Sequence, residues 1–430
     1  MVPRRRRFSR QLRVALPRSA SLLRRLGAQG AVRVLAATGD PIAQLAALAD
    51  TEQVHDVYER IRARGPVTVS RIGPVALTSH DLCADVLRRP EFGVQARSAR
   101  AGLYLGPLAG SFVELDPPDH TRLRRLAAPA FRPREIRAWA PRVEAIMDGM
   151  LDRVAGRSRF DLTTDVAAPF PIAVIAELMG VPVDDPDRFA HLGHVVGLAL
   201  DGASSADQLQ QLARTADELA DLFTRLAGER DRLPGDDVVG RLAAAWREGL
   251  TTREEYVSSC SLLLLAGFET TVNLIGNGVA AMQRDRRVWQ ALVEDPGLAP
   301  AAVEETLRLE SPLQMTSRIN ATDVEIAGRA LPAGSYVLVL LAAAGRDPEV
   351  HPRPGTFRLD RTGEPEHLAF SGGIHYCLGA PLARLEGEVA FRALATRLPD
   401  LTLAGTPRRR TGLTLRGYES LPVRSSWPAG

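Results

Sequence analysis

The stretch from Phe370 to Gly379 reads FSGGIHYCLG and places Cys377 in a glycine-rich loop just before a predicted helix. Backbone N–H groups at a helix start stabilise the negative charge of a thiolate, which favours its use as a metal ligand. A lone cysteine is more often a buried, inert thiol, so Cys377 by itself identifies no site. The fixed spacing F-x-x-G-x-H-x-C-x-G is what favours the ligand interpretation.

That spacing resembles the haem-thiolate signature of the cytochrome P450 family. The resemblance implies that Cys377 binds the iron of a b-type haem and pushes electron density toward it. It implies that Gly373 lets the backbone approach the macrocycle where a Cβ would clash, and that Gly379 leaves room where the helix starts. Phe370 would shield the Fe–S bond from water, and His375 would lie beside a haem propionate.

A second motif, AGFETT, lies inside a long apolar segment that predicts a helix from about Arg253 to Gln283. It resembles the family's distal motif, [AG]-G-x-[DE]-T-[TS]. The resemblance implies that Ala266 and Gly267 leave space for dioxygen beside the haem, and that the Thr270 hydroxyl disturbs the helix ladder and hydrogen-bonds the oxygen. Glu269 would bring protons in from solvent. Without the cysteine loop downstream, a Glu-Thr pair would be interpreted simply as a polar helix face.

A third motif, DPPDHTRLR at 116–124, resembles the family pattern D-P-P-[ED]-H-T-R-x-R. Asp116 fits a helix N-cap, with Pro117 at the first helical position. His120 and Arg124 are four residues apart, so they reach the same side of a helix. The resemblance implies that they bind the haem carboxylates through charge-assisted hydrogen bonds, with two further partners (Arg318 and His375).

A fourth motif, Glu305 and Arg308 in AAVEETLRLESP, puts an acid and a base on one helix face. A lone E-x-x-R is usually a surface ion pair, but here it matches the family's core E-x-x-R. A third arginine joins this pair in many relatives, and Thr356 occupies the matching position in this chain. Either Arg353 or Arg358 compensates, or the network is only a pair.

The elements that carry these motifs are mainly helical. Helices are predicted over 51–64, 80–88 and 380–397, and an almost wholly helical pattern runs from 115 to 310. Short strands are predicted for VTVSRI and VALTS as a hairpin, then for DVEIAG, SYVLVLLAA and the C-terminal LTLAG and TGLTLRGYESLPVR. We expect a mainly α chain with small β-sheets, which is the cytochrome P450 fold. The sequence AGRDP at 344–348 departs from the family's usual Ala-Asn-Arg-Asp-Pro and leaves local packing there open.

Composition limits the number of domains, the disulfide content and the expected compartment of the protein. The 430 residues suit one large domain or two ordinary ones, and three cysteines without C-x-x-C spacing are too few for a disulfide framework. A reducing cytoplasm is therefore the expected compartment. We expect residues 1–45 to form an Arg-rich N-terminal extension and residues 46–430 to form a single catalytic domain.

The first 30 residues carry nine arginines and no acid, and removing them from the net charge of +3 leaves −6 for the rest. No apolar run follows that would make a signal peptide or an integral membrane anchor. Two interpretations stay open: a solvated extension, or a basic amphipathic helix on an anionic membrane surface. The acidic body and the absence of a recognition motif disfavour nucleic-acid binding.

The resemblance implies a monooxygenase that inserts one atom of O2 into an apolar substrate by hydroxylation, with epoxidation also open. No flavin, nicotinamide or iron–sulfur motif occurs, so electrons from NAD(P)H would arrive through a ferredoxin and a ferredoxin reductase. Arginines on the cysteine side would steer an acidic ferredoxin (Arg122, Arg125 and Arg384). The alternatives are a peroxygenase, which usually lacks the acid–alcohol pair, and a catalytically silent haem-binding recruitment or sensor module.

The segments expected to line the substrate pocket are 92–112, 189–212, 313–316 and 413–418. Their side chains are mostly apolar and include no obvious fixed charge (Leu103, Tyr104, Leu105, Val195, Leu198, Leu313 and Met315). They favour a lipophilic natural product, such as a polyketide, macrolide, terpenoid or fatty acyl chain, free or carrier-bound. Polyketide-type or macrolide-type substrates come first by analogy alone.

Overall fold

The computed structural model describes residues 30, 32–48, 53–71, 73–95, 106–182, 186–200, 205–232 and 237–427; the nine N-terminal arginines lie outside them. The helices are α2 (Pro41–Ala46), α3 (Val54–Arg62), α4 (His80–Arg88), α5 (Asp119–Ala127), α6 (Pro133–Ala138), α7 (Ala140–Val154), α8 (Pro169–Met179), α9 (Pro186–Leu200), α10 (Ala206–Arg232), α11 (Val238–Arg247), α12 (Arg253–Arg284), α13 (Arg286–Glu294), α14 (Ala299–Leu309), α15 (Leu341–Ala344) and α16 (Ala380–Arg397). The strands are β1 (Val67–Val69), β2 (Val75–Leu77), β3 (Phe92–Gly93), β4 (Arg159–Asp161), β5 (Thr316–Asn320), β6 (Val324–Ile326), β7 (Arg329–Leu331), β8 (Tyr336–Val339), β9 (Thr402–Leu403), β10 (Arg408–Arg409), β11 (Tyr418–Ser420) and β12 (Pro422–Arg424).

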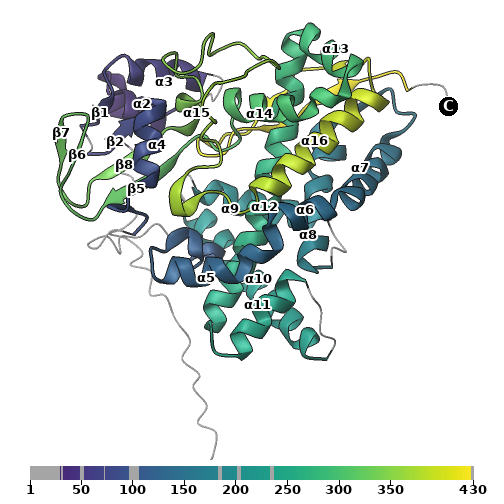
Figure 1. Cartoon of the computed structure of the whole chain (residues 1–430), viewed down its shortest axis with the longest axis horizontal. Helices are drawn as coiled ribbons and strands as arrows, with labels where there is room; N and C mark the ends of the chain where they lie inside the picture. Colours follow the sequence, from purple (N-terminus) through teal and green to yellow (C-terminus); the bar gives the residue numbers. More distant parts are fainter. Residues whose placement is uncertain are drawn as a thin grey trace, which may run out of the picture.

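One end of the molecule combines strands with the short helices α2, α3 and α4, and the rest is mostly helical (Figure 1). The main sheet has the strand order β1-β2-β8-β5-β3. Its β1 and β2 pair antiparallel, as the predicted hairpin requires, and β2 pairs parallel with β8. A second sheet has the order β4-β12-β9. The expectation of a mainly α chain with small sheets is confirmed.

The predicted strand over SYVLVLLAA is too long. β8 ends at Val339, and the next residues form α15, whose four side chains are all buried. A run of consecutive buried apolar residues is compatible with a helical turn as well as with a strand covered on both faces, and here the chain forms the turn. The expected start of the domain at residue 46 falls at the end of α2, where Ile42 and Leu45 are already buried beside α3.

Helix α12 runs through the core and packs against α8, α9, α14 and α16. It begins with a capping box in which Thr252 and Glu255 satisfy each other's backbone N–H groups. Among the described residues it is the single helix that could cross a membrane by length and composition. However, 83% of its apolar window is buried inside the protein, which is how a core helix behaves. Together with α16, this helix positions the motifs.

Candidate active site

The loop that carries Cys377 is a tight turn held against α4. The Cys377 N–H donates to the Phe370 carbonyl oxygen at 2.9 Å. Gly373 has a φ of +63°, and a Cβ there would lie 2.2 Å from the Leu87 carbonyl oxygen, so the protein itself requires glycine at this position. At Gly379 a Cβ would meet only the Cys377 Sγ, at 4.0 Å. The two glycines of the motif therefore have different roles: Gly373 avoids a clash with the backbone of α4, and Gly379 leaves space beside the Cys377 sulfur.

The Cys377 side chain is accessible, whereas the other two cysteines are fully buried (Cys83 and Cys260). Burial among protein groups nevertheless raises the pKa of the Cys377 thiol, opposed by the N–H groups of Gly379 and Ala380 at the start of α16. The thiol is therefore accessible although protein groups surround it closely. Its nearest groups favour a thiolate once a cation binds it.

Phe370 lies beside this loop under a fixed arginine. The side chain is buried, and the Arg384 guanidinium carbon lies 4.7 Å from its ring centroid. Arg384 also pairs with Glu304, Nε to Oε1 at 2.7 Å, and with Glu366 at 3.0 Å. Because two carboxylates already neutralise it, Arg384 is a poor candidate for steering an acidic partner.

Four nitrogen-bearing side chains converge next to the cysteine loop. The rings of His120 and His375 lie 4.5 Å apart between centroids, and Arg124 donates to the Tyr376 carbonyl oxygen. Burial, with Arg318 as a second cause, lowers the pKa of His375 to about 3. Burial also lowers the pKa of Arg318 to about 10.

These groups lack the carboxylates that such a cluster needs. Both ring nitrogens of His120 and the Nε2 of His375 are buried without a hydrogen-bond partner among the described residues. The Ile374 backbone lies close to His120 but outside good hydrogen-bond geometry. The nearest acid, Asp116, accepts from the N–H groups of Val94 and Gln95. Orphaned ring nitrogens beside the buried Arg318 and the half-buried Arg124 fit the two propionates of a haem, so the residues present are suited to this cofactor.

Asp116 does not cap the helix as predicted, because α5 begins at Asp119 with Pro118 at the N-cap position. Its carboxylate reaches across to the chain after β3 instead, where it holds two backbone N–H groups. The predicted same-side placement of His120 and Arg124 on α5 is compatible with the convergence described above.

On α12, Ala266 is accessible although the neighbouring Leu264 and Leu265 are buried. An accessible alanine in the middle of a core helix means that this face lines internal space. The Thr270 Oγ1 donates to the Ala266 carbonyl oxygen at 3.2 Å. Gly267 has another role, since a Cβ there would lie 2.6 Å from Ile175 of α8. Its lack of a side chain therefore serves helix packing directly.

Glu269 is buried and forms an ion pair with Arg410, which follows β10. Arg410 Nη2 also lies 2.9 Å from His194 Nδ1 on α9. Burial raises the pKa of Glu269, while Arg410 opposes the rise. Sequence reasoning missed Arg410 and His194, because neither belongs to a motif and both reach Glu269 only through the fold.

Helix α9 lies directly over Glu269. A Cβ at Gly193 would be 3.0 Å from Glu269 Oε2, and a Cβ at Gly197 would be 3.5 Å from Oε1 and 3.2 Å from Leu415. The two glycines are four residues apart, so one face of α9 has no side chains where it crosses the carboxylate. This close approach brings α9, α12 and the C-terminal turn together, as expected for segments around a pocket.

Other predicted pocket residues are placed differently. Met315 packs against the cluster formed by α2, α3 and α15, away from α9. Leu313 pairs with Leu415 through an isolated β-bridge. The stretch 96–105 and the Leu198 side chain lie outside the described residues.

The Glu305–Arg308 pair is the centre of a larger network. Arg308 contacts both Glu305 oxygens at 2.7 Å and donates to the carbonyl oxygen of Gly345 at 2.7 Å. The third arginine is Arg361, whose Nε lies 2.9 Å from both Glu305 oxygens. Both expected alternatives, compensation by Arg353 or Arg358 and a network of only a pair, are wrong: Arg361 makes the third contact, and the Arg358 side chain pairs with the exposed Asp360.

The departure at Gly345 also has a physical reason. A Cβ at this position would lie 2.3 Å from the Arg308 carbonyl oxygen, so the backbone closes tightly on α14. Glycine is therefore required where the Gly345 carbonyl accepts from the Arg308 guanidinium.

Comparison with known proteins places this geometry in a family. The cytochrome P450 family model matches residues 242–397. The chain is 42% identical over 348 residues to cytochrome P450 107B1 of Saccharopolyspora erythraea, covering 79% of this chain and 80% of that protein. Among solved structures, P450BioI in complex with a hexadec-9Z-enoic acid-ligated acyl carrier protein is similar, with a TM-score of 0.82 and 33% identity, covering 87% of this chain and 99% of that one. The tirandamycin C-bound monooxygenase TamI has a TM-score of 0.77 and 35% identity, covering 88% of this chain and 99% of that one.

Proposed function

The chain belongs to the cytochrome P450 family of monooxygenases, and from this premise we propose that it hydroxylates a lipophilic natural product. The observation that carries the proposal is the convergence of unpartnered donors beside the accessible Cys377, together with the accessible Ala266 on the core helix α12. No other cluster among the described residues combines a thiol with carboxylate-binding groups.

In this proposal Cys377 holds the iron of haem b, and four side chains bind its propionates (His120, Arg124, Arg318 and His375). When bound, a haem with a thiolate ligand supplies the activation of dioxygen. Phe370 and Arg384 exclude water from the sulfur side, and Gly373 and Gly379 allow the loop to turn into α16. Ala266 keeps the facing surface of α12 free of bulk, and Gly267 lets α12 pack closely against α8.

Glu269 and Thr270 are proposed to handle protons. Burial favours the protonated form of the Glu269 carboxyl, and its ion pair with Arg410 favours the charged form, so the group is poised between them. The Thr270 hydroxyl lies one residue away on the face that carries Ala266, so it can relay a proton toward the internal space. Arg410 and His194 would position Glu269 and connect it with α9.

The substrate is proposed to be apolar and large enough to reach α9. The fatty acyl chain of P450BioI and the tirandamycin C of TamI are both lipophilic, and they illustrate a carrier-bound and a free substrate. Leu415, which is buried and would lie 3.2 Å from a Cβ at Gly197, supports an apolar ceiling near Glu269. In our proposal a polyketide-type substrate is favoured over a fatty acyl chain.

Electrons are proposed to come from a ferredoxin and its reductase in the cytoplasm. Arg122 is occupied by Glu255 at 2.6 Å and by Asp119, so it is a weak docking group, as is Arg384. Exposed arginines without a described carboxylate partner follow instead along α5 and α6 (Arg125, Arg132, Arg134 and Arg137). Helix α6 packs against α16, so this basic surface is close to the thiolate helix.

The first test is an optical titration of the ferric haem protein with polyketides, macrolides, terpenoids and fatty acids, free and carrier-bound. A ligand that displaces the axial water shifts the Soret band to shorter wavelength, and we expect a saturable shift with one class. Turnover with that ligand should require ferredoxin, reductase and NAD(P)H. Turnover with hydrogen peroxide alone would instead indicate a peroxygenase, and a lack of reduction with every ligand would contradict the proposal.

Coupling then tests the proton residues. In T270A we expect NAD(P)H consumption to continue while product per NAD(P)H falls, because the hydroxyl that relays the proton is gone. T271A is a poor control, since Thr271 hydrogen-bonds Glu386, so T164A on the exposed start of the 163–167 turn serves better. Unchanged coupling in T270A would contradict the role of Thr270.

A further inference from the structure

The outer face of the β4-β12-β9 sheet carries two arginines side by side. Arg424 on β12 is the direct antiparallel partner of Arg159 on β4, and on its other side it is the partner of Thr402 on β9. The neighbouring row, with Phe160 and Val423, is buried. Because side chains alternate along a strand, the Arg159–Arg424–Thr402 row projects outward as one line of donors.

This arrangement is unfavourable for the protein alone. Like charges directly opposite each other on neighbouring strands are destabilising. Neither guanidinium has a carboxylate within ion-pair distance among the residues that the structure describes, although other exposed arginines nearby do, such as Arg157 with Asp165 at 2.8 Å. Arg424 Nε donates to Thr402 Oγ1 at 3.1 Å, which fixes the guanidinium and leaves its two terminal nitrogens for another acceptor.

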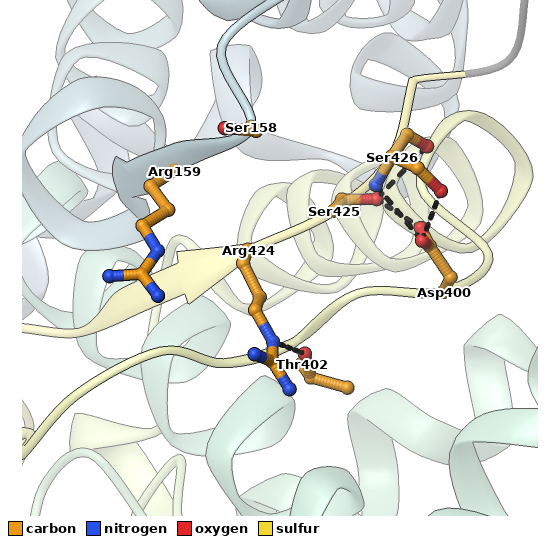
Figure 2. Close-up of a pocket in the computed structure, with 7 residues that line it drawn as sticks. All are labelled: Ser158, Arg159, Asp400, Thr402, Arg424, Ser425 and Ser426. Carbon is orange, nitrogen blue, oxygen red and sulfur yellow. Dashed lines mark hydrogen bonds between the residues drawn. The ribbon is translucent and has the colours of Figure 1, made fainter.

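The row lines a pocket of about 440 Å³, and Figure 2 shows both guanidinium groups on the same side of the sheet. The single acid of the lining, Asp400, is engaged on the other side of the pocket. It accepts from the Ser426 N–H at 2.9 Å and from the hydroxyls of Ser425 and Ser426. These bonds lower the pKa of Asp400 against the effect of burial, and its oxygens are directed away from the arginines.

We propose that this pocket is a binding site for a phosphate-class oxyanion, held by Arg159, Arg424 and the Thr402 hydroxyl. The planar guanidinium fork matches the oxygens of such an anion, and two forks from adjacent strands can each contribute hydrogen bonds. The anion removes the repulsion between the two arginines and joins β4 to the C-terminal strand β12. The ligand is free phosphate or a phosphate ester.

This site is separate from the thiolate centre. Cys377 precedes the first turn of α16, whereas Asp400 and Thr402 follow its last turn, and 18 residues at 1.5 Å each put the two ends about 27 Å apart. An anion bound here would therefore not contact substrate. It would stabilise the fold, or link the stability of the fold to the concentration of a phosphorylated metabolite.

The test uses the full haem-loaded protein and measures its unfolding temperature against inorganic phosphate, with sodium chloride keeping the ionic strength constant. We expect a saturable rise, and about tenfold or more weaker binding in R424Q and in R159Q, because each loses charged hydrogen bonds. R329Q is the matched control. Arg329 is an exposed strand arginine without a described carboxylate partner, and it faces Ile326 across its hairpin rather than another arginine.

A second measurement does not depend on the ligand. Without phosphate, R159Q should unfold at a slightly higher temperature than the parent protein, because the like-charge pair is gone, while the unfolding temperature of R329Q should not change.

Glycerol 2-phosphate in place of phosphate identifies the source of the anion: tighter binding of the ester points to a phosphorylated metabolite, and tighter binding of phosphate points to the free ion. Absence of a saturable shift, or equal affinity in R424Q and R329Q, would overturn the proposal.

Discussion

At the scale of single residues, Cys377 differs from an inert thiol by its neighbours. It is accessible within the protein, the N–H groups at the start of α16 are directed at its sulfur, and Arg124 adds a positive charge. Burial raises the pKa of this thiol, and the N–H groups and Arg124 oppose that rise and favour the thiolate. The glycines around it follow from backbone contacts, most directly at Gly373, where the Leu87 carbonyl leaves no space for a Cβ.

The first prediction concerns this ligand. In C377A the reduced, carbon monoxide-bound protein should lose its thiolate spectrum, because no other sulfur is available to the iron. C260A is the control: Cys260 is fully buried on α12, so its removal should leave the spectrum intact. A normal thiolate spectrum in C377A would refute the assignment.

The second prediction concerns Arg410. Because Arg410 lowers the pKa of Glu269, R410Q should let that pKa rise, and the protonated form should persist to higher pH. The pH profile of product formed per NAD(P)H, measured across the neutral and alkaline range, should therefore shift to higher pH. R408Q, which removes the neighbouring exposed arginine paired with Glu419, should not move it. A purely structural role would lower stability in R410Q without shifting the profile.

At the scale of elements, α14 is anchored to the segment before the cysteine loop through one buried carboxylate. Glu305 accepts from Arg308 on its own helix, from the Arg361 side chain and from the Arg358 backbone N–H at 2.8 Å. Arg308 then reaches the carbonyl oxygens of Gly345 and Pro354. The chain from 345 to 361 is therefore ordered by charge-assisted bonds in place of a regular ladder.

The third prediction follows from this network. R361Q should destabilise the protein by about 1.5–3 kcal/mol, since the buried Glu305 loses a charge-assisted pair while it keeps Arg308. R358Q is a close control, because its side chain meets only an exposed acid and its backbone bond to Glu305 remains. Urea unfolding of the two variants measures the difference. Equal stability would show that Arg361 is dispensable.

At the scale of the whole molecule, Glu310 joins segments far apart in the sequence. It follows α14, it is 2% exposed, and it lies 2.6 Å from Arg284 of α12, 3.5 Å from Arg416 and 3.6 Å from Arg346. Burial alone would raise the pKa of Glu310, but these arginines outweigh it and lower the pKa to about 2.

The fourth prediction is the resulting pH dependence. A carboxylate with a folded pKa of about 2, against an unfolded value of 4.5, stabilises the folded state above pH 4.5. That contribution is lost as the pH falls through 4.5 toward 2. The urea midpoint should therefore fall steeply over this range in the parent protein and less steeply in E310Q. A residual slope is expected from Glu304, whose pKa His367 and Arg384 lower to about 2 against the effect of burial. Parallel slopes would contradict the assignment.

The helices and the motif positions could be predicted from the sequence because each depends on local spacing. The long helix through Thr270, the helix after Cys377 and the β1–β2 hairpin are examples. Contacts made by residues in irregular segments, which have no hydrophobic periodicity, could not be predicted. Arg361 and Arg410 come from irregular segments, and which carboxylate each one meets depends on how distant elements pack. The helical turn after Val339 could not be predicted from the sequence for a related reason, since an apolar run buried on all sides suits a strand or a helix equally.

The unequal access of the three cysteines has a practical use. Cys83 and Cys260 are fully buried, and burial raises the pKa of the Cys83 thiol to about 12, so neither should react with a maleimide while the fold is intact. Cys377 is accessible, and a cofactor bound through its sulfur would occupy it. Intact-mass spectrometry after brief labelling would then count loaded and unloaded molecules directly: chains without cofactor gain one adduct, and chains that carry it gain none.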